Sequence, residues 1–151
     1  MQRIISPEIL IIDDDAVDQE ALRRHLVKAF AGENVNIHMC STGAEGLEML
    51  QSRTFGCVFL DYLLPDMNGV ALLRAIYDPK TDLANAPVVM LTGKGSEAVM
   101  IEALRKGVQD YIIKDDISVE SLKIAIMKAK ELFELKRSRV QAEEKLQHAQ
   151  K

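Results

Sequence analysis

The sequence predicts an α/β fold in which a doubly wound parallel sheet of five strands is flanked by five helices. Short apolar runs alternate five times with longer segments of helical periodicity, a pattern typical of stacked β–α units. Three of the runs are almost unbroken Val, Ile, Leu or Phe, as expected for strands that helices cover on both faces. With 151 residues, 48% of them hydrophobic, the chain can bury the core of one such domain.

The predicted strands and helices alternate regularly along the chain. Strands are expected at residues 9–12, 35–39, 57–60, 88–91 and 111–113. Helices are expected at residues 16–30, 44–51, 70–77 and 97–106, with a last helix from about residue 119. In the first helix Leu22 and Leu26 lie on the face turned to the sheet, and Arg23 and Arg24 lie on the other side. Gly32 then marks the end of this helix.

The last helical pattern is longer than the sheet requires and runs to the final residue. Its sheet-facing stripe consists of Leu122, Ile126, Ala129 and Phe133. We therefore expect a domain over residues 1–133 and a helical extension over residues 134–151 that connects to an output domain. A second row on the extension keeps the three- and four-residue spacing of a short coiled coil: Leu132, Leu135, Arg139, Ala142, Leu146 and Ala149. The pattern fits two alternatives about equally well. One is a homodimer that pairs through this row, and the other is a helical tail exposed to solvent.

Charge and cysteine content exclude several classes of function. Residues 1–117 carry a net charge of −7 and residues 118–151 a net charge of +3. An acidic globule repels phosphate backbones, and the tail mixes both signs, so we expect no nucleic-acid binding. The apolar runs are too short for a bilayer span of about 20 residues, so no membrane insertion is expected. Cys40 and Cys57 lie in buried-looking strands, which favours a reducing, cytoplasmic location.

Polar residues follow four of the five predicted strands, at the edge where open parallel sheets bind ligands. Asp13 and Asp14 follow the first strand and Asp61 follows the third. If the first strand lies between the second and third, these carboxylates converge. Converging carboxylates repel one another, and oxygen ligands without a nearby histidine favour Mg²⁺ as the ion that relieves the repulsion.

Thr92 and Lys114 end the fourth and fifth strands and complete this set. The Thr92 hydroxyl is a donor, and the Lys114 ammonium is a compact cation that suits Asp61 or a phosphoryl group attached to it. Each feature alone has a simpler explanation, such as helix capping or helix-dipole compensation for Asp15 and Asp18. The combination favours a phosphoryl-accepting site in which Asp61, at the central strand, is the acceptor.

At these residues the chain resembles the receiver domain of two-component response regulators, a bacterial signalling family, over about residues 8–133. The matching pieces are the pair Asp13-Asp14, the segment LDYLLPDMNG at residues 60–69, Leu91-Thr92-Gly93, and DYIIK at residues 110–114. The spacing of Asp61, Pro65 and Gly69 within one loop is the most specific element. The resemblance implies a flavodoxin-like sheet in the order 2-1-3-4-5.

The resemblance also implies a function and assigns roles to residues. Asp61 would accept a phosphoryl group from a partner histidine kinase or histidine phosphotransfer protein, making the chain a regulatory phosphoacceptor rather than an enzyme. Mg²⁺ would be held by Asp14, Asp61 and the backbone carbonyl of Leu63, with Asp13 acting largely through water. Thr92 and Tyr111 would form a switch that alters the face of the fourth helix, fifth strand and fifth helix. That face is a second possible homodimer surface.

Two departures from the family pattern are visible. Gly93 stands where the family commonly has Ala, which loosens the backbone there. Asp115 follows Lys114 where the family usually has Pro. Since cis peptide bonds are essentially confined to proline, a cis bond after the lysine is not expected here.

The same residues disfavour two enzymatic interpretations. A flavodoxin-like flavin protein needs a phosphate loop after the first strand, where this chain has three aspartates that would repel phosphate. An aspartate-dependent phosphatase needs a second carboxylate two residues after the nucleophile, where this chain has Leu63. A receiver-like scaffold without phosphotransfer and a stand-alone response regulator are further alternatives. The expected output module is a kinase, a sensor or a cyclase.

Overall fold

The computed structural model describes residues 8–78, 84–93, 97–105 and 110–149. The strands are β1 (Glu8–Ile12), β2 (Asn36–Cys40), β3 (Cys57–Asp61), β4 (Val88–Thr92) and β5 (Asp110–Ile113). The helices are α1 (Ala16–Ala29), α2 (Gly43–Ser52), α3 (Gly69–Ile76), α4 (Glu97–Arg105) and α5 (Val119–Ala149), with a 3₁₀ turn at Lys114–Asp116. Each expected element is present with its ends shifted by at most two residues, except that Lys106, the expected end of the fourth helix, lies outside the described residues. The 3₁₀ turn was not foreseen.

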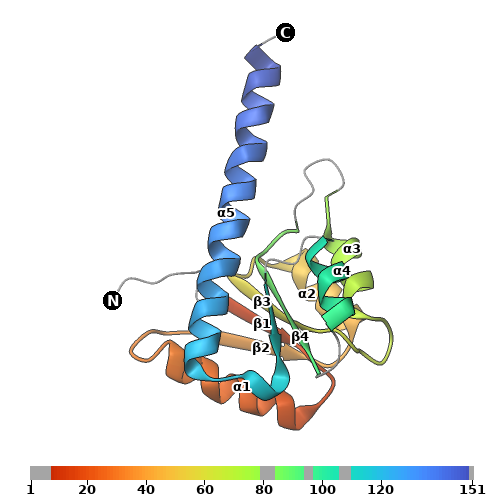
Figure 1. Cartoon of the computed structure of the whole chain (residues 1–151), viewed down its shortest axis with the longest axis vertical. Coiled ribbons are helices and arrows are strands. Elements are labelled where there is room, and N and C mark those ends of the chain that lie inside the picture. Colours follow the sequence, from red (N-terminus) through yellow and green to blue (C-terminus); the bar gives the residue numbers. More distant parts are fainter. Residues whose placement is uncertain (1–7, 79–83, 94–96, 106–109, 150–151) are drawn as a thin grey trace.

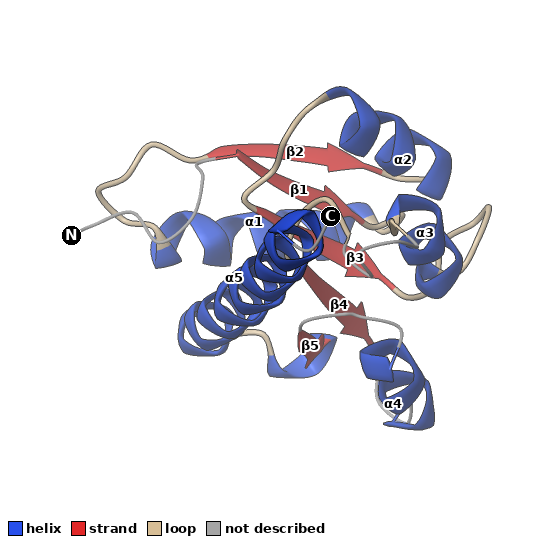
Figure 2. Ribbon diagram, turned by 90° about the horizontal axis from the view of Figure 1, so that it is seen from above, coloured by secondary structure: helices blue, strands red, loops and turns tan. Residues whose placement is uncertain are grey.

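All five strands are parallel and lie in the order β2-β1-β3-β4-β5. This order confirms the fold expected from the sequence and from the family resemblance. Ile12 is in register with Leu60 of β3, and Thr92 is in register with Ile113 of β5. Figure 2 shows the strands side by side with helices on both faces of the sheet. The residues that follow β1, β3, β4 and β5 therefore meet at one edge.

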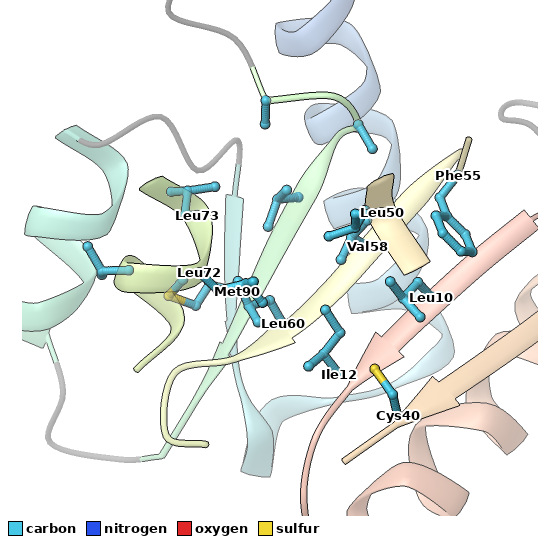
Figure 3. Packing of buried hydrophobic residues seen from close by; sticks show 14 of the residues in the cluster. Leu10, Ile12, Cys40, Leu50, Phe55, Val58, Leu60, Leu72, Leu73 and Met90 are labelled. Carbon is cyan, nitrogen blue, oxygen red and sulfur yellow. The ribbon is translucent and has the colours of Figure 1, made fainter. Parts of the chain in front are cut away.

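Two hydrophobic clusters fix the helices on opposite faces of the sheet. On one face, α1 and α5 pack over the strands, and the buried residues include Leu26, Phe59 and Ile126. On the other face, α2, α3 and α4 pack over side chains such as Leu60 and Met90 (Figure 3). Since both faces are covered, the three central strands β1, β3 and β4 are almost continuously apolar, as the sequence indicated. Both cysteines are free thiols buried in this sheet.

Local capping sets the ends of α1. The Asp15 carboxylate accepts hydrogen bonds from the backbone N–H groups of Val17 and Asp18, so Asp15 is the N-cap. The helix ends at Ala29, and Gly32 adopts a φ of 85°, a conformation that glycine tolerates without strain. The stop predicted at Gly32 is therefore confirmed.

The last helix, α5, packs on the sheet only along its first half. The predicted stripe of Leu122, Ile126, Ala129 and Phe133 is buried. Beyond Phe133 the helix extends away from the sheet, as Figure 1 shows, and its side chains are mostly exposed as far as Ala149. The remaining two residues of the predicted helix, 150 and 151, lie outside the described part of the chain.

The loop between β3 and α3 is held tightly against its surroundings. Asn68 caps α3 by accepting a hydrogen bond from the Ala71 N–H. Asp66 accepts hydrogen bonds from the backbone N–H groups of Gly43 and Ala44, which ties this loop to the start of α2. The Gly69 N–H donates to the Tyr62 carbonyl at 2.6 Å. These bonds fix the loop that directly follows Asp61.

Replacing Gly69 by alanine should destabilise this loop. A Cβ at residue 69 would lie 3.0 Å from the Asp61 carbonyl oxygen and 3.1 Å from the Tyr62 Cα, and backbone atoms have little freedom to move away. We expect Gly69→Ala to lower the free energy of unfolding in urea by about 1–3 kcal/mol. Gly93→Ala is the matched control, because a Cβ there would meet nothing within 4 Å, and its effect should stay within about 0.5 kcal/mol. Equal losses in both variants would contradict this account.

Candidate functional site

Three aspartates converge at the carboxyl edge of the sheet. Asp13 and Asp14 directly follow β1 and Asp61 ends β3, and these two strands are neighbours. One carboxylate oxygen of each residue lies within 4.8 Å of the other two. Asp13 and Asp61 are buried, whereas Asp14 is exposed to solvent. The sequence-based expectation that these carboxylates meet is therefore confirmed by their geometry.

Lys114 lies beside this cluster and contacts three carboxylates. Its Nζ lies 3.1 Å from Asp61 Oδ2, 3.0 Å from Asp13 Oδ2 and 2.8 Å from Asp18 Oδ2. The lysine follows β5 at the far edge of the sheet, so its long side chain reaches back over the end of β4. The pairing with Asp61 matches the expectation, but the shortest of the three contacts, to Asp18 on α1, was missed.

Backbone and amide groups hold the acidic residues in place. The Asp15 N–H donates to Asp13 Oδ1 at 2.9 Å, and the Leu63 N–H donates to Asp61 Oδ1 at 3.3 Å. The Gln19 side-chain amide donates to the carbonyl oxygens of both Asp13 and Cys40, which joins the ends of β1 and β2. Gln19 was also missed, because a polar residue one turn into a helix gives no sequence signal of such a role.

The electrostatics of the cluster are unfavourable when only protein charges are present. Burial, and then the Asp13 charge, raise the pKa of Asp61 to about 6, although Lys114 acts in the opposite direction. Burial alone would lower the pKa of Lys114, but hydrogen bonds to Asp18 and Asp13 outweigh it and hold that pKa above its ordinary value. Lys114 therefore remains positively charged. The raised pKa of Asp61 means that protonation, or binding of a further cation, would stabilise this carboxylate.

The donor set of this cluster fits a hard divalent cation. It consists of carboxylate oxygens, and no histidine or cysteine among the described residues belongs to it. Mg²⁺ takes few carboxylates and retains water, which suits one exposed and two buried aspartates. Leu63, whose backbone carbonyl was expected to be a further ligand, lies in the loop two residues after Asp61.

Thr92 and Tyr111 lie on the neighbouring strands. Thr92 ends β4 and is buried, and its hydroxyl makes a long contact of 3.4 Å with the Gly93 carbonyl oxygen. Tyr111 is in register with Met90 of β4, and 37% of its surface is exposed. The peptide bond that follows Lys114 is trans, in agreement with the expectation for a residue that precedes Asp115.

Comparison with known proteins gives consistent matches. A model of the response regulator receiver domain matches residues 9–127. The transcriptional regulatory protein SrrA of Staphylococcus aureus (strain NCTC 8325 / PS 47) is 34% identical over 110 residues, which are 73% of this chain and 42% of SrrA. The chain thus matches less than half the length of this relative.

Solved structures give the same family. The structure of NtrX from Brucella abortus has a TM-score of 0.72 at 27% identity, over 89% of this chain and 29% of that one. A response regulator receiver domain protein from Clostridium thermocellum has a TM-score of 0.70 at 26% identity, over 85% and 97% of the two chains. Within the described residues, no helix combines the length and apolar character needed to cross a bilayer.

Asp61→Asn should stabilise the protein when divalent cations are absent. Because the pKa of Asp61 is raised in the folded state, ionising it costs stability as the pH rises from about 4 through about 6. In EDTA at pH 7.5 we expect Asp61→Asn to raise the free energy of unfolding in urea by about 1–3 kcal/mol. This gain should shrink as the pH falls and vanish below about pH 4. A variant that is less stable than the wild type at pH 7.5 would refute this interpretation.

Proposed function

The chain belongs to the response regulator receiver domain family, and from this premise we propose that Asp61 is the phosphoacceptor of a two-component signalling pathway. The phosphoryl group would come from a phosphohistidine of a histidine kinase or histidine phosphotransfer protein. An Asp61 carboxylate oxygen attacks phosphorus, the phosphorus–nitrogen bond breaks, and the imidazole leaves. The observation that carries the proposal is the position of Asp61, whose carboxylate contacts the Lys114 ammonium and lies in one cluster with the Asp13 and Asp14 carboxylates.

The residues around Asp61 supply positioning and charge neutralisation, the two contributions on which phosphoryl transfer mainly depends. Lys114 is 3.1 Å from Asp61 and is in place to pair with an oxygen of the transferred group. Asp14, Asp61 and the Leu63 carbonyl would hold Mg²⁺, with Asp13 acting largely through water. The ion would neutralise further charge on the transferred oxygens, while the Asp61 carboxylate oxygen that does not hold the ion would remain free to react.

We further propose that Thr92 and Tyr111 carry the phosphorylation state to the surface. Among the described residues the Thr92 hydroxyl makes one long contact, to the Gly93 carbonyl oxygen, so a new phosphoryl oxygen can attract it at little cost. Movement of Thr92 would leave space into which Tyr111 rotates from its half-exposed position. This change would alter the face formed by α4, β5 and α5.

The extended helix α5 is proposed to link the receiver, residues 1–133, to an output module. The burial of its sheet-facing stripe ends at Phe133, and residues 134–151 form the proposed connector. SrrA is named as a transcriptional regulatory protein, whereas the output module proposed for this chain is a kinase, a sensor or a cyclase. The free, buried thiols of Cys40 and Cys57 support a cytoplasmic location.

Phosphorylation can be tested directly by mass. Incubation with acetyl phosphate and Mg²⁺ should add one phosphoryl group, about 80 Da, to the intact protein. The gain should require Mg²⁺ and should be absent in Asp61→Asn. Wild-type protein that binds Mg²⁺ but gains no mass, from either acetyl phosphate or a phosphorylated histidine phosphotransfer protein, would favour a receiver-like scaffold without phosphotransfer.

A homodimer through the extension of α5 is a separate proposal with its own test. Leu135 and Leu146 are 69% and 60% exposed and lie in the predicted coiled-coil row. The double variant Leu135→Asp/Leu146→Asp should shift the mass measured by light scattering from dimer to monomer. The matched control is Gln141→Asp/Gln147→Asp, which places the same two charges on another face of the exposed helix. A wild-type protein that is monomeric, or a mass that neither variant changes, would exclude this seam.

A further inference from the structure

Asp18 makes the shortest of the three contacts to Lys114, yet it lies outside the cluster of three aspartates. Its Oδ2 is 2.8 Å from Lys114 Nζ, and it projects from the first turn of α1 rather than from the end of a strand. The Asp18 side chain is 42% exposed, whereas that of Lys114 is 22% exposed. The contact therefore joins α1 to the 3₁₀ turn that follows β5, at the rim of the site.

The Lys114 ammonium is surrounded by three carboxylates in this arrangement. An ammonium group has three N–H donors, and three carboxylates, those of Asp13, Asp18 and Asp61, lie within 3.1 Å of Nζ. A phosphoryl group on Asp61 needs the charge of the same ammonium. The lysine must then divide its interactions between the phosphoryl oxygens and its existing partners.

The three partners differ in what phosphorylation does to them. Asp61 loses its charge when it becomes an acyl phosphate, and Asp13 belongs to the cluster that fits a divalent cation. Asp18 neither accepts the phosphoryl group nor belongs to the cluster that fits a cation, so its negative charge remains beside Lys114 throughout the reaction. A carboxylate next to the ammonium both occupies a donor and repels the incoming anion.

We propose that Asp18 is a positioning residue that competes with the phosphoryl group for Lys114. It holds the lysine in the unphosphorylated protein and lowers the affinity of the site for the phosphoryl anion. The proposal rests on the proposed role of Asp61 as phosphoacceptor. A cavity of about 110 Å³ beside the pair, lined by Asp18, Lys114 and His25 among others, leaves both side chains room to adjust.

The test uses beryllofluoride, formed from BeCl₂ and NaF with MgCl₂, as a phosphoryl analogue in the full chain. Binding is followed by the intrinsic fluorescence of the three tyrosines, Tyr62, Tyr77 and Tyr111. Asp18→Asn removes the charge but keeps an oxygen that can accept from Lys114, so it should tighten beryllofluoride binding about two- to fivefold. The rate of mass gain from acetyl phosphate should rise by a similar factor. Asp18→Glu, which retains the charge, should behave like the wild type.

Two controls separate competition for Lys114 from a general effect of charge. Glu20→Gln removes one charge from the same helix, but Glu20 pairs with Arg23, so its effect should be small. In a Lys114→Ala background, Asp18→Asn should lose its effect. An Asp18→Asn variant with unchanged or weaker binding, or a gain that persists without Lys114, would overturn the proposal.

The same measurements distinguish an error in the role of Asp18 from an error in the proposed phosphoacceptor role of Asp61. If Asp61 is not the acceptor, the wild-type protein itself binds no beryllofluoride and gains no mass from acetyl phosphate. If only the role of Asp18 is wrong, wild type and Asp18→Asn both respond, and to the same extent. Circular dichroism spectra of each variant distinguish either outcome from loss of folding.

Discussion

Repulsion among the carboxylates at the carboxyl edge of the sheet is the constraint on which the site depends. Asp13, Asp14 and Asp61 bring their oxygens within 4.8 Å of one another, and two of the three are buried. Lys114 offsets part of this charge, but the pKa of Asp61 remains raised to about 6. The excess of negative charge in the folded protein therefore favours the binding of a cation. The proposed phosphoryl transfer depends on the same cation.

The fold creates this constraint through the order of its strands. Because β1 lies between β2 and β3, the residues after β1 and at the end of β3 are forced together. The tightly packed loop after Asp61, with Gly69 against its backbone, keeps the carboxylate from moving away. One hydrophobic cluster on each face packs the helices against the sheet whose strand ends carry these carboxylates.

The fold and the central site were predictable because their signals are local. Apolar runs locate the strands, and the polar residue after each run locates the carboxyl edge, so Asp13, Asp61 and Lys114 were found from the sequence. The contacts of Asp18 and Gln19 were not predictable, because they depend on how α1 is placed over the ends of β1 and β5. A charged residue in the first turn of a helix gives the same sequence pattern whether it interacts with the helix dipole or with a lysine far away in the sequence.

Titration of Mg²⁺ by isothermal calorimetry at pH 7.5 tests whether the three aspartates form a cation site. We expect one ion to bind per chain in the wild type and most of this binding to be lost in Asp14→Asn. Asp116→Asn, a neutralisation of an exposed aspartate outside the cluster, should leave binding unchanged. An absence of binding in the wild type, or equal binding in Asp14→Asn, would contradict the assignment of the cluster as a cation site.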